Sequence, residues 1–237
     1  MKDMKISLLT IAGLSFLTAS SHAAIMLGTS GYTNNFTTAP TLEMGFSTRN
    51  ASGAPETITN TAANRNAWIN GNVEAATTNV AIGTNSASIT TLNVPRHQSV
   101  LGVIQSSPIN NAASVMMLTV RNTTGGDITG VTVQYTLGGV TTGSGEQLPG
   151  VGLLFSRTGW AWTAFANNTT DGDKTQVATF NVANNALFYL LWADDNGNGG
   201  TEALLTYDNL QLTAIPEPSA LVLSLLGLGA IVARRRR

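Results

Sequence analysis

The sequence contains no cysteine among its 237 residues. The protein therefore cannot form a disulfide, bind zinc through thiolates or use a thiol as a nucleophile. It also offers no cysteine to which a lipid anchor could be attached. A core of apolar side chains must hold the protein together, and the chain is long enough to bury one.

Charged residues are also scarce, at 11% of the chain, and the basic ones gather at its two ends. Half of the 12 lysines and arginines lie there: Lys2, Lys5, Arg234, Arg235, Arg236 and Arg237. Between the ends, acidic residues outnumber basic ones and no cluster of basic residues occurs. This mildly acidic composition argues against nucleic-acid binding.

Helical patterns are missing as well, because no stretch of three turns repeats apolar residues with the period of a helix. Thr, Asn, Gly, Ala and Val dominate the middle of the chain, and this composition favours strands joined by turns. We expect strands at residues 41–46, 87–95, 99–105, 114–122, 128–138, 151–156, 159–166, 175–182, 186–193 and 203–214.

Two of these segments indicate which strand faces are buried. Residues 128–138 alternate, with Val131, Val133 and Tyr135 on one face and polar residues on the other. Residues 186–193 are almost wholly apolar, which predicts a central strand buried on both faces. Short strands separated by turn residues are typical of two packed sheets. We therefore predict an all-β fold, a single antiparallel β-sandwich of jelly-roll type.

The N-terminus has the three parts of a secretory signal peptide. Two lysines precede an apolar stretch at residues 6–18, and small residues follow at 19–24. We place the cleavage between Ala23 and Ala24, because the residues before this bond fit the small-x-small rule. The segment therefore predicts export and a mature chain that starts at Ala24.

Residues 214–237 read AIPEPSALVLSLLGLGAIVARRRR. Within them, residues 220–233 form an apolar run whose one polar residue is Ser224. As a helix this run would span about 21 Å, which is short of a hydrocarbon core of about 30 Å. The four arginines after it would keep the tail in the cytoplasm and the preceding domain outside. The segment predicts a short transmembrane helix, either a permanent anchor or a temporary one.

Pro216, Glu217 and Pro218, followed by the apolar run and the arginines, closely resemble the PEP-CTERM sorting signal over residues 215–237. The resemblance implies that the triplet is recognised by an exosortase, a membrane protease-transpeptidase that cuts near it after a transient stay in the inner membrane. It also implies a Gram-negative bacterium that makes exopolysaccharide, often in a biofilm, and a destination at the cell surface or in the extracellular matrix. The chain then divides into a signal peptide (1–23), an ectodomain (24–214) and a sorting signal (215–237).

Residues that could carry hydrolytic chemistry are few. His97 is the one histidine after the predicted cleavage, and no G-x-S-x-G nucleophile motif accompanies it. A carboxylate pair for glycoside hydrolysis would come from a scattered set, namely Glu43, Glu56, Glu74, Glu146 and Glu202. We therefore predict that the protein is not an enzyme, and a secreted glycan-active hydrolase is the less favoured alternative.

Metal binding has one weak set of candidates, Asp194, Asp195 and Asp208. Calcium prefers oxygen ligands of this kind, but the spacing does not match an EF-hand. A hairpin turn in which Asp and Asn side chains accept backbone hydrogen bonds is the favoured interpretation. We therefore expect no cofactor, with calcium as the alternative.

Trp160 and Trp162 would share one face of the predicted strand 159–166. Exposed tryptophan rings stack on sugars, whereas buried ones belong to the core, which is the favoured interpretation. Taken together, the sequence predicts an exported, exosortase-sorted surface or matrix protein with a non-enzymatic structural or adhesive role. Its expected partners are the exosortase and extracellular polysaccharide. A carbohydrate-binding module that uses the two tryptophans is the main alternative.

Overall fold

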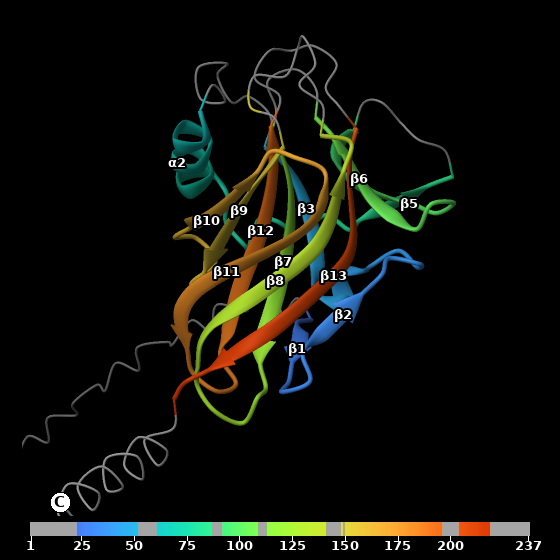
Figure 1. Ribbon diagram of the computed structural model, residues 1–237. Helices are drawn as coiled ribbons and strands as arrows, with labels where there is room; N and C mark the ends of the chain where they lie inside the picture. The colour runs from blue at the N-terminus through green and yellow to red at the C-terminus, as the bar shows by residue number, and fades with distance from the viewer. Residues whose placement is uncertain are drawn as a thin grey trace, which may run out of the picture.

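Strands make up most of the residues that the computed structural model describes, namely 23–51, 61–86, 92–108, 113–140, 148, 150–195 and 204–218. The strands form two mixed sheets that lie face to face in Figure 1. The expectation of an all-β fold is confirmed, whereas the jelly-roll connectivity stays a prediction.

The first sheet is built around β7 and β12, which pair antiparallel along nearly all of their length. Its order is β1 (Ile25–Leu27), β7 (Ala113–Asn122), β12 (Leu187–Asp195), β9 (Val151–Ser156) and β10 (Thr163–Asn168), and β3 (Phe46–Ala51) also pairs with β7. The apolar run predicted to be a central strand is β12, so this expectation is confirmed.

The second sheet is built around β8 and β13, which pair antiparallel with a break in register. Its order is β11 (Gly172–Val182), β8 (Ile128–Gly138), β13 (Leu205–Pro216), β6 (Val103–Ser107), β5 (Leu92–Gln98) and β4 (Gly83–Asn85), and β2 (Tyr32–Asn34) also pairs with β13. The predicted bounds of β8 and β9 match the structure.

The expectation of a purely antiparallel fold is wrong in two places. The short strand β1 runs parallel to β7, and the short strand β4 runs parallel to the end of β5. A tight turn forces neighbouring strands to be antiparallel, but neither of these pairs is joined by one. The residues between the paired segments allow the chain to return in the same direction.

The main core lies between the two sheets. The alternation predicted in β8 is observed, because Val131, Val133 and Tyr135 are buried there while the residues between them are partly exposed. Phe188, Leu190 and Trp192 of β12 meet them from the opposite sheet, so the core joins both layers.

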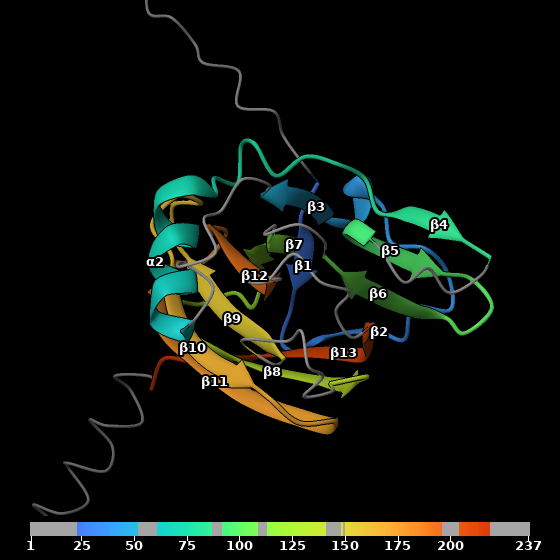
Figure 2. The ribbon, with the colours of Figure 1, turned by 90° about the horizontal axis from the view of Figure 1, so that it is seen from above.

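A second, smaller core covers the outer face of the first sheet. It contains Leu191 of β12, Ile69 and Val73 from the region of α2 (Ala62–Asn72), and Trp162 from the bend between β9 and β10. Figure 2 shows α2 beside β9 and β10, on the side of the first sheet that faces away from the second. Because β12 contacts one core on each face, both faces need apolar side chains, which accounts for its unbroken apolar run.

The helix α2 corrects the expectation that helices are missing. Its N-terminus is capped by Thr61, whose Oγ1 accepts a hydrogen bond from the backbone N–H of Asn64 over 3.1 Å. Its buried residues are Arg65 and Ile69, which lie one turn apart. An arginine does not count as apolar in a periodicity search, so a buried face made of arginine and isoleucine escapes detection.

Three predicted strand boundaries are also wrong. The 3₁₀ helix η1 (Leu42–Met44) replaces most of the strand expected at 41–46, and β3 starts after it. A turn with Gly102 at a φ of 66° interrupts the strand expected at 99–105. The strand expected at 159–166 begins only at Thr163.

Both predicted processing segments lie largely outside the described residues. The leader before residue 23 and the segment after residue 218, with its apolar run and four arginines, stay predictions. Within the described ranges, no helix has the length and apolar character needed to cross a membrane. Ala23 and Ala24 are described, and β1 starts at the next residue, Ile25, which is buried.

Candidate functional site

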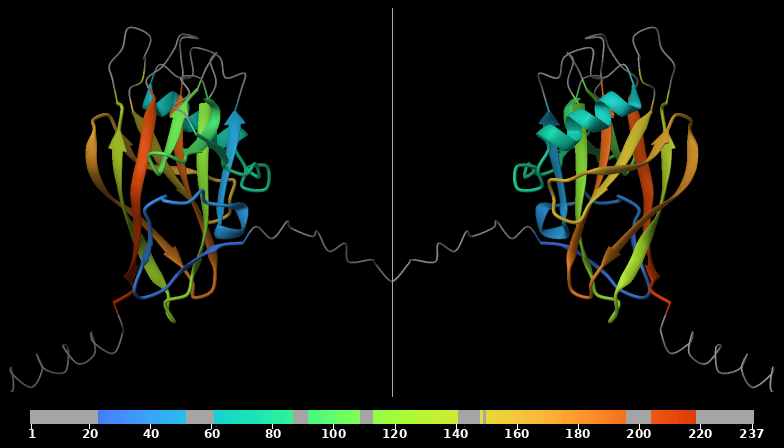
Figure 3. Two further views of the ribbon diagram at one scale, coloured as in Figure 1. Left: turned by 90° about the vertical axis from the view of Figure 1, so that its right-hand side faces the viewer. Right: turned by 90° about the vertical axis from the view of Figure 1, so that its left-hand side faces the viewer.

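The predicted recognition triplet begins on the last residue of the last strand. Pro216 is the final residue of β13 and pairs with Ile128 of β8. The backbone N–H of Glu217 then donates a hydrogen bond of 3.2 Å to the carbonyl oxygen of Asp127. Pro216, Glu217 and Pro218 are all exposed. Figure 3 shows β13 running down the domain to its lower tip, so the triplet emerges at one end of the folded body.

A bulge interrupts β13 before it reaches this end. Its register with β8 shifts between Asp208 and Gln211, and Asn209 has a φ of 52°, in the left-handed region. Asparagine is one of the few non-glycine residues that adopt this conformation readily. The preceding Tyr207 is buried, and this burial raises the pKa of its hydroxyl well above its ordinary value. Leu210, on the other side of the bulge, is buried as well, so β13 faces the core both before and after this interruption.

On one edge, β13 also changes partners at the bulge. Residues 205–207 pair with β6, and residues 210–212 pair with β2. Between these two segments, Asp208 and Asn209 pair with no strand on this edge within the described ranges. The ladder is therefore interrupted on this edge next to the bulge, where the backbone N–H of Asn209 donates to Oδ1 of Asp208 over 2.6 Å.

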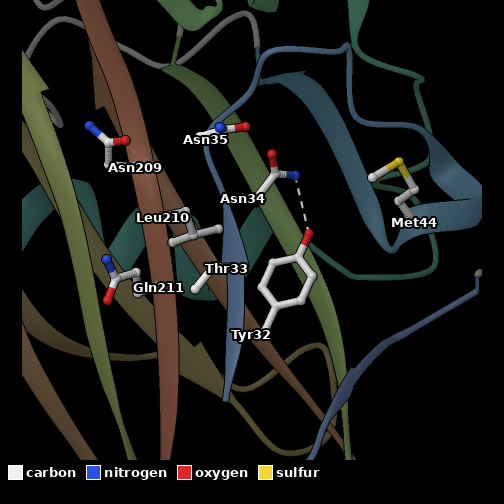
Figure 4. Close-up of a pocket in the computed structure, with 8 residues that line it drawn as sticks. All are labelled: Tyr32, Thr33, Asn34, Asn35, Met44, Asn209, Leu210 and Gln211. Atoms are coloured by element: carbon white, nitrogen blue, oxygen red, sulfur yellow. Dashed lines mark hydrogen bonds between the residues drawn. The ribbon is translucent and has the colours of Figure 1, made fainter. Parts of the chain in front are cut away.

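A hollow of about 380 Å³ lies beside this gap (Figure 4). Its lining is rich in amide and other polar side chains, and includes Tyr32, Asn34, Asn35, Met44, Asn209 and Gln211. Nδ2 of Asn34 donates a hydrogen bond of 3.1 Å to the hydroxyl of Tyr32, as drawn in Figure 4. Burial raises the pKa of this tyrosine, so the group is a neutral hydroxyl. The hollow thus combines one aromatic ring with several amides.

A second hollow, of about 300 Å³, shares Asn209 and Gln211 with the first and extends over β8 and β11. Hydrogen-bonded side chains cross the strands here. Oγ1 of Thr136 donates to Oδ1 of Asp173 over 2.7 Å, and Nδ2 of Asn209 donates to Oγ1 of Thr136 over 3.4 Å. We call the two adjoining hollows the polar strip, defined by the residues that line them.

The loop that forms one wall of the first hollow is held in a strained conformation. Phe36 has a φ of 51°, which is rare for a bulky side chain. Its ring is buried and meets Phe46 edge-on at 5.9 Å, and its N–H donates to Oδ1 of Asn34 over 2.8 Å. Its carbonyl oxygen lies 2.6 Å from Nε2 of His97, which is 2% exposed. His97 therefore holds this loop from inside the protein.

The three aspartates considered as calcium ligands do not come together. Asp194 and Asp195 are buried at the end of β12 in the first sheet, whereas Asp208 lies on β13 in the second. In the part of the chain that the structure describes, no three acidic or histidine side chains gather as a metal site would require. Asp194 and Asp195 belong to the strand and not to the turn that the sequence suggested.

Asp195 forms a buried ion pair with Arg65 of α2. Nη1 of Arg65 lies 3.2 Å from Oδ1 of Asp195, and the two side chains are 1% and 0% exposed. Nη2 of Arg65 also donates to Oδ1 of Asn167 on β10 over 2.8 Å. Burial, opposed by the charge of Arg65, raises the pKa of Asp195 to about 6. The pair joins the helix to the first sheet.

The two tryptophans differ in burial, and the expectation that they share one strand face is wrong. Both lie in the bend before β10. Trp162 is 6% exposed, and its Nε1 donates a hydrogen bond of 2.6 Å to the carbonyl oxygen of Val73. This ring is therefore not accessible to a sugar. Trp160 is 63% exposed and stands alone.

The glutamates considered for hydrolysis do not form a carboxylate pair among the described residues. Glu43 and Glu74 are exposed and lie in separate segments, one on η1 and the other after α2. Glu56, Glu146 and Glu202 lie outside the described residues.

The polar strip is not among the sites that the sequence predicts. Its walls come from residues 32–35 and 209–211, which no local pattern connects.

Comparison with known proteins identifies one segment of the chain. The PEP-CTERM protein-sorting motif matches residues 214–237, and no curated protein matches the chain. The matched segment starts inside β13 and contains the exposed triplet, so the motif overlaps the last strand of the domain. This motif marks an exported protein that is sorted at the membrane and processed by an exosortase. The chain therefore carries a PEP-CTERM protein-sorting motif over residues 214–237.

Proposed function

We propose that this protein is a surface or extracellular-matrix protein with a structural or adhesive role, and not an enzyme, in the exopolysaccharide of a Gram-negative bacterium. The observation that carries the proposal is the sorting motif, whose triplet is exposed immediately after β13. The folded domain reaches the outside of the cell as cargo of this signal. A protein delivered in this way meets secreted polysaccharide as its main surrounding polymer.

The geometry of the triplet supports recognition by a processing enzyme. Proline restricts its own backbone and that of the preceding residue to extended conformations, which is the form that protease grooves accept. Pro216 and Pro218 flank an exposed Glu217 whose side chain is free to meet a recognition pocket. On this proposal, Pro216, Glu217 and Pro218 are the recognition residues.

Replacing Glu217 and Pro218 by alanine in the native host is expected to leave most of the protein uncleaved in the inner membrane. Both side chains are exposed, and Pro216 keeps its place in β13, so the folded domain should not change. Cell fractionation with immunoblotting measures the location and the length of the product. Thr213→Ala, an exposed position on the same strand, is the matched control. A processed surface product from the altered triplet, in the amount made by the control, would refute exosortase sorting through PEP.

A carbohydrate-binding role is the second candidate, and the polar strip favours it over the tryptophan pair of the sequence analysis. A glycan-active hydrolase has less support, because Glu43 and Glu74, the two candidate glutamates that the structure describes, are exposed on separate segments. The buried acids of β12 have a structural role in the proposal. Calcium is not part of it.

A further inference from the structure

We infer that the polar strip is a binding site for a neutral polysaccharide chain, which would lie across β2, β13 and β8. The inference rests on the proposed role in an exopolysaccharide matrix and names where the contact is made. Three independent features of the described residues lead to it. They are the gap in the sheet, the strained walls, and the chemistry of the lining.

The gap interrupts the pairing of a central strand on one edge. Asp208 and Asn209 lie between the segment of β13 that pairs with β6 and the segment that pairs with β2. Edge strands usually lack partners in this way, whereas a strand between two neighbours does not. At this interruption the backbone N–H of Asn209 donates to Oδ1 of Asp208 over 2.6 Å, so the polar atoms that an incoming ligand would meet are held in fixed positions.

Backbone strain is concentrated at the same place. Three non-glycine residues of the described ranges have a positive φ; one of them, Asn209, lines the first hollow, and another, Phe36, follows Asn35, which also lines it. Such conformations persist where the surrounding structure holds them, and they occur often at ligand sites. His97, buried under the loop, supplies one of the holding contacts through the carbonyl oxygen of Phe36. The two walls are thus preorganised.

The lining matches hydroxyl-rich ligands. Asn34, Asn35, Asn209 and Gln211 bring amide groups to the lining. Several of their atoms make internal hydrogen bonds, but each amide has two N–H donors and two acceptor lone pairs, so a sugar with many hydroxyl groups can use the remainder. The ring of Tyr32 adds an apolar surface whose hydroxyl is already hydrogen-bonded. Because the second hollow continues from Asn209 and Gln211, the strip suits an extended chain better than a single sugar.

The charges near the strip select against acidic polysaccharides. Asp173 borders the second hollow, and Asp208 lies at the bulge. Lys174 also lines the second hollow, and its Nζ donates to Oγ1 of Thr170 over 2.9 Å and to the carbonyl oxygen of Asp171 over 3.0 Å. An anionic polymer would therefore meet two carboxylates for this one cation.

The test is native affinity electrophoresis of the full chain in mild detergent, through gels that contain dextran, hydroxyethylcellulose or alginate. We expect retardation by at least one of the two neutral polymers and none by alginate. Gln211→Ala combined with Asn209→Gly should weaken this binding about thirtyfold, which is the factor that corresponds to two lost amides at about 1 kcal/mol each. Glycine keeps the left-handed conformation of the bulge, so the fold should persist.

Trp160→Ala is the matched control, because it removes an exposed ring from the opposite sheet and should bind as the unaltered protein does. Gln211→Ala alone, at an exposed position, gives a second reading with little risk to folding. The inference is overturned if neither neutral polymer retards the protein, if alginate alone does so, or if both Gln211 variants bind normally. Binding is measured without an exosortase, so its failure is separate from a failure of sorting in the host.

Discussion

Replacing Arg65 by alanine is expected to lower the free energy of unfolding by about 3–5 kcal/mol. The change removes the partner of a carboxylate that is 0% exposed, so Asp195 must either stay ionised in the interior without a counter-charge or take up a proton at neutral pH, and both cost free energy. It also removes the hydrogen bond to Asn167 and the tie between α2 and the first sheet. Urea unfolding followed by circular dichroism at neutral pH measures the effect.

The packing around Arg65 strengthens this expectation. The guanidinium lies against Gly152 of β9, where any side-chain carbon would collide with it. The sheet therefore has a place shaped for this group, and alanine would leave that place empty. A cavity adds to the cost of the lost ion pair.

Two further variants distinguish a lost charge pair from lost packing. Arg65→Met combined with Asp195→Leu should recover most of the stability, because apolar residues often replace a buried ion pair without loss. Arg49→Ala, which removes a more exposed arginine from β3, should change the free energy by less than about 1 kcal/mol. If Arg65→Ala were as stable as Arg49→Ala, the ion pair would have no role in holding the helix.

Asp195 also makes part of the stability depend on pH. Its pKa is raised from 3.8 to about 6, chiefly by burial, so the folded protein holds the proton more tightly than the unfolded chain does. Its contribution is therefore fully present below about pH 4 and is lost as the pH rises through about 6. The unfolding free energy of the protein, minus that of Asp195→Asn, should fall across this window. A constant difference would contradict the assignment.

Replacing Trp162 by alanine is expected to cost about 3–5 kcal/mol of stability, as for other buried tryptophans. The ring fills the smaller core beside Ile69 and Val73, and its Nε1 donates to the carbonyl oxygen of Val73. Truncation would open a cavity and leave that carbonyl without its partner. The melting temperature and the urea midpoint should both fall.

Trp160→Ala provides the comparison two residues away in the same bend. Its ring is 63% exposed, so the loss should stay within about 0.5 kcal/mol. If Trp162→Ala lost no more stability than Trp160→Ala, the smaller core would not depend on the ring of Trp162. In that case α2 would have to be held mainly by Arg65.

Local sequence patterns predict which faces of a single strand are buried. The alternation in β8 and the apolar run in β12 identify their buried faces, because these patterns depend on neighbouring residues alone. The parallel pairing of β1 with β7 depends on residues far apart, so no local pattern contains it. The same holds for α2, whose buried arginine finds its partner at Asp195.

The candidate sites differ in the same way, because one is a contiguous motif and the other is formed by residues far apart in the sequence. The sorting triplet is a contiguous motif and was found from the residues themselves. The polar strip needs Asn34 and Asn209 to be brought together by the pairing of β2 with β13, and nothing in either segment indicates this. Trp160 and Trp162 were grouped because they are close in sequence, but the bend before β10 separates their rings into solvent and core.

The backbone hydrogen bond from Glu217 to Asp127 holds the triplet against the folded domain and so limits how the domain can move relative to it. A flexible linker of n residues lets its ends wander over about 5–6 Å times the square root of n, whereas β13 is paired as far as Pro216. Any group that became joined beside the triplet would therefore fix the position and the orientation of the whole domain. The molecules on one surface would share a single height and tilt, and Asn209 would face the same way on every copy.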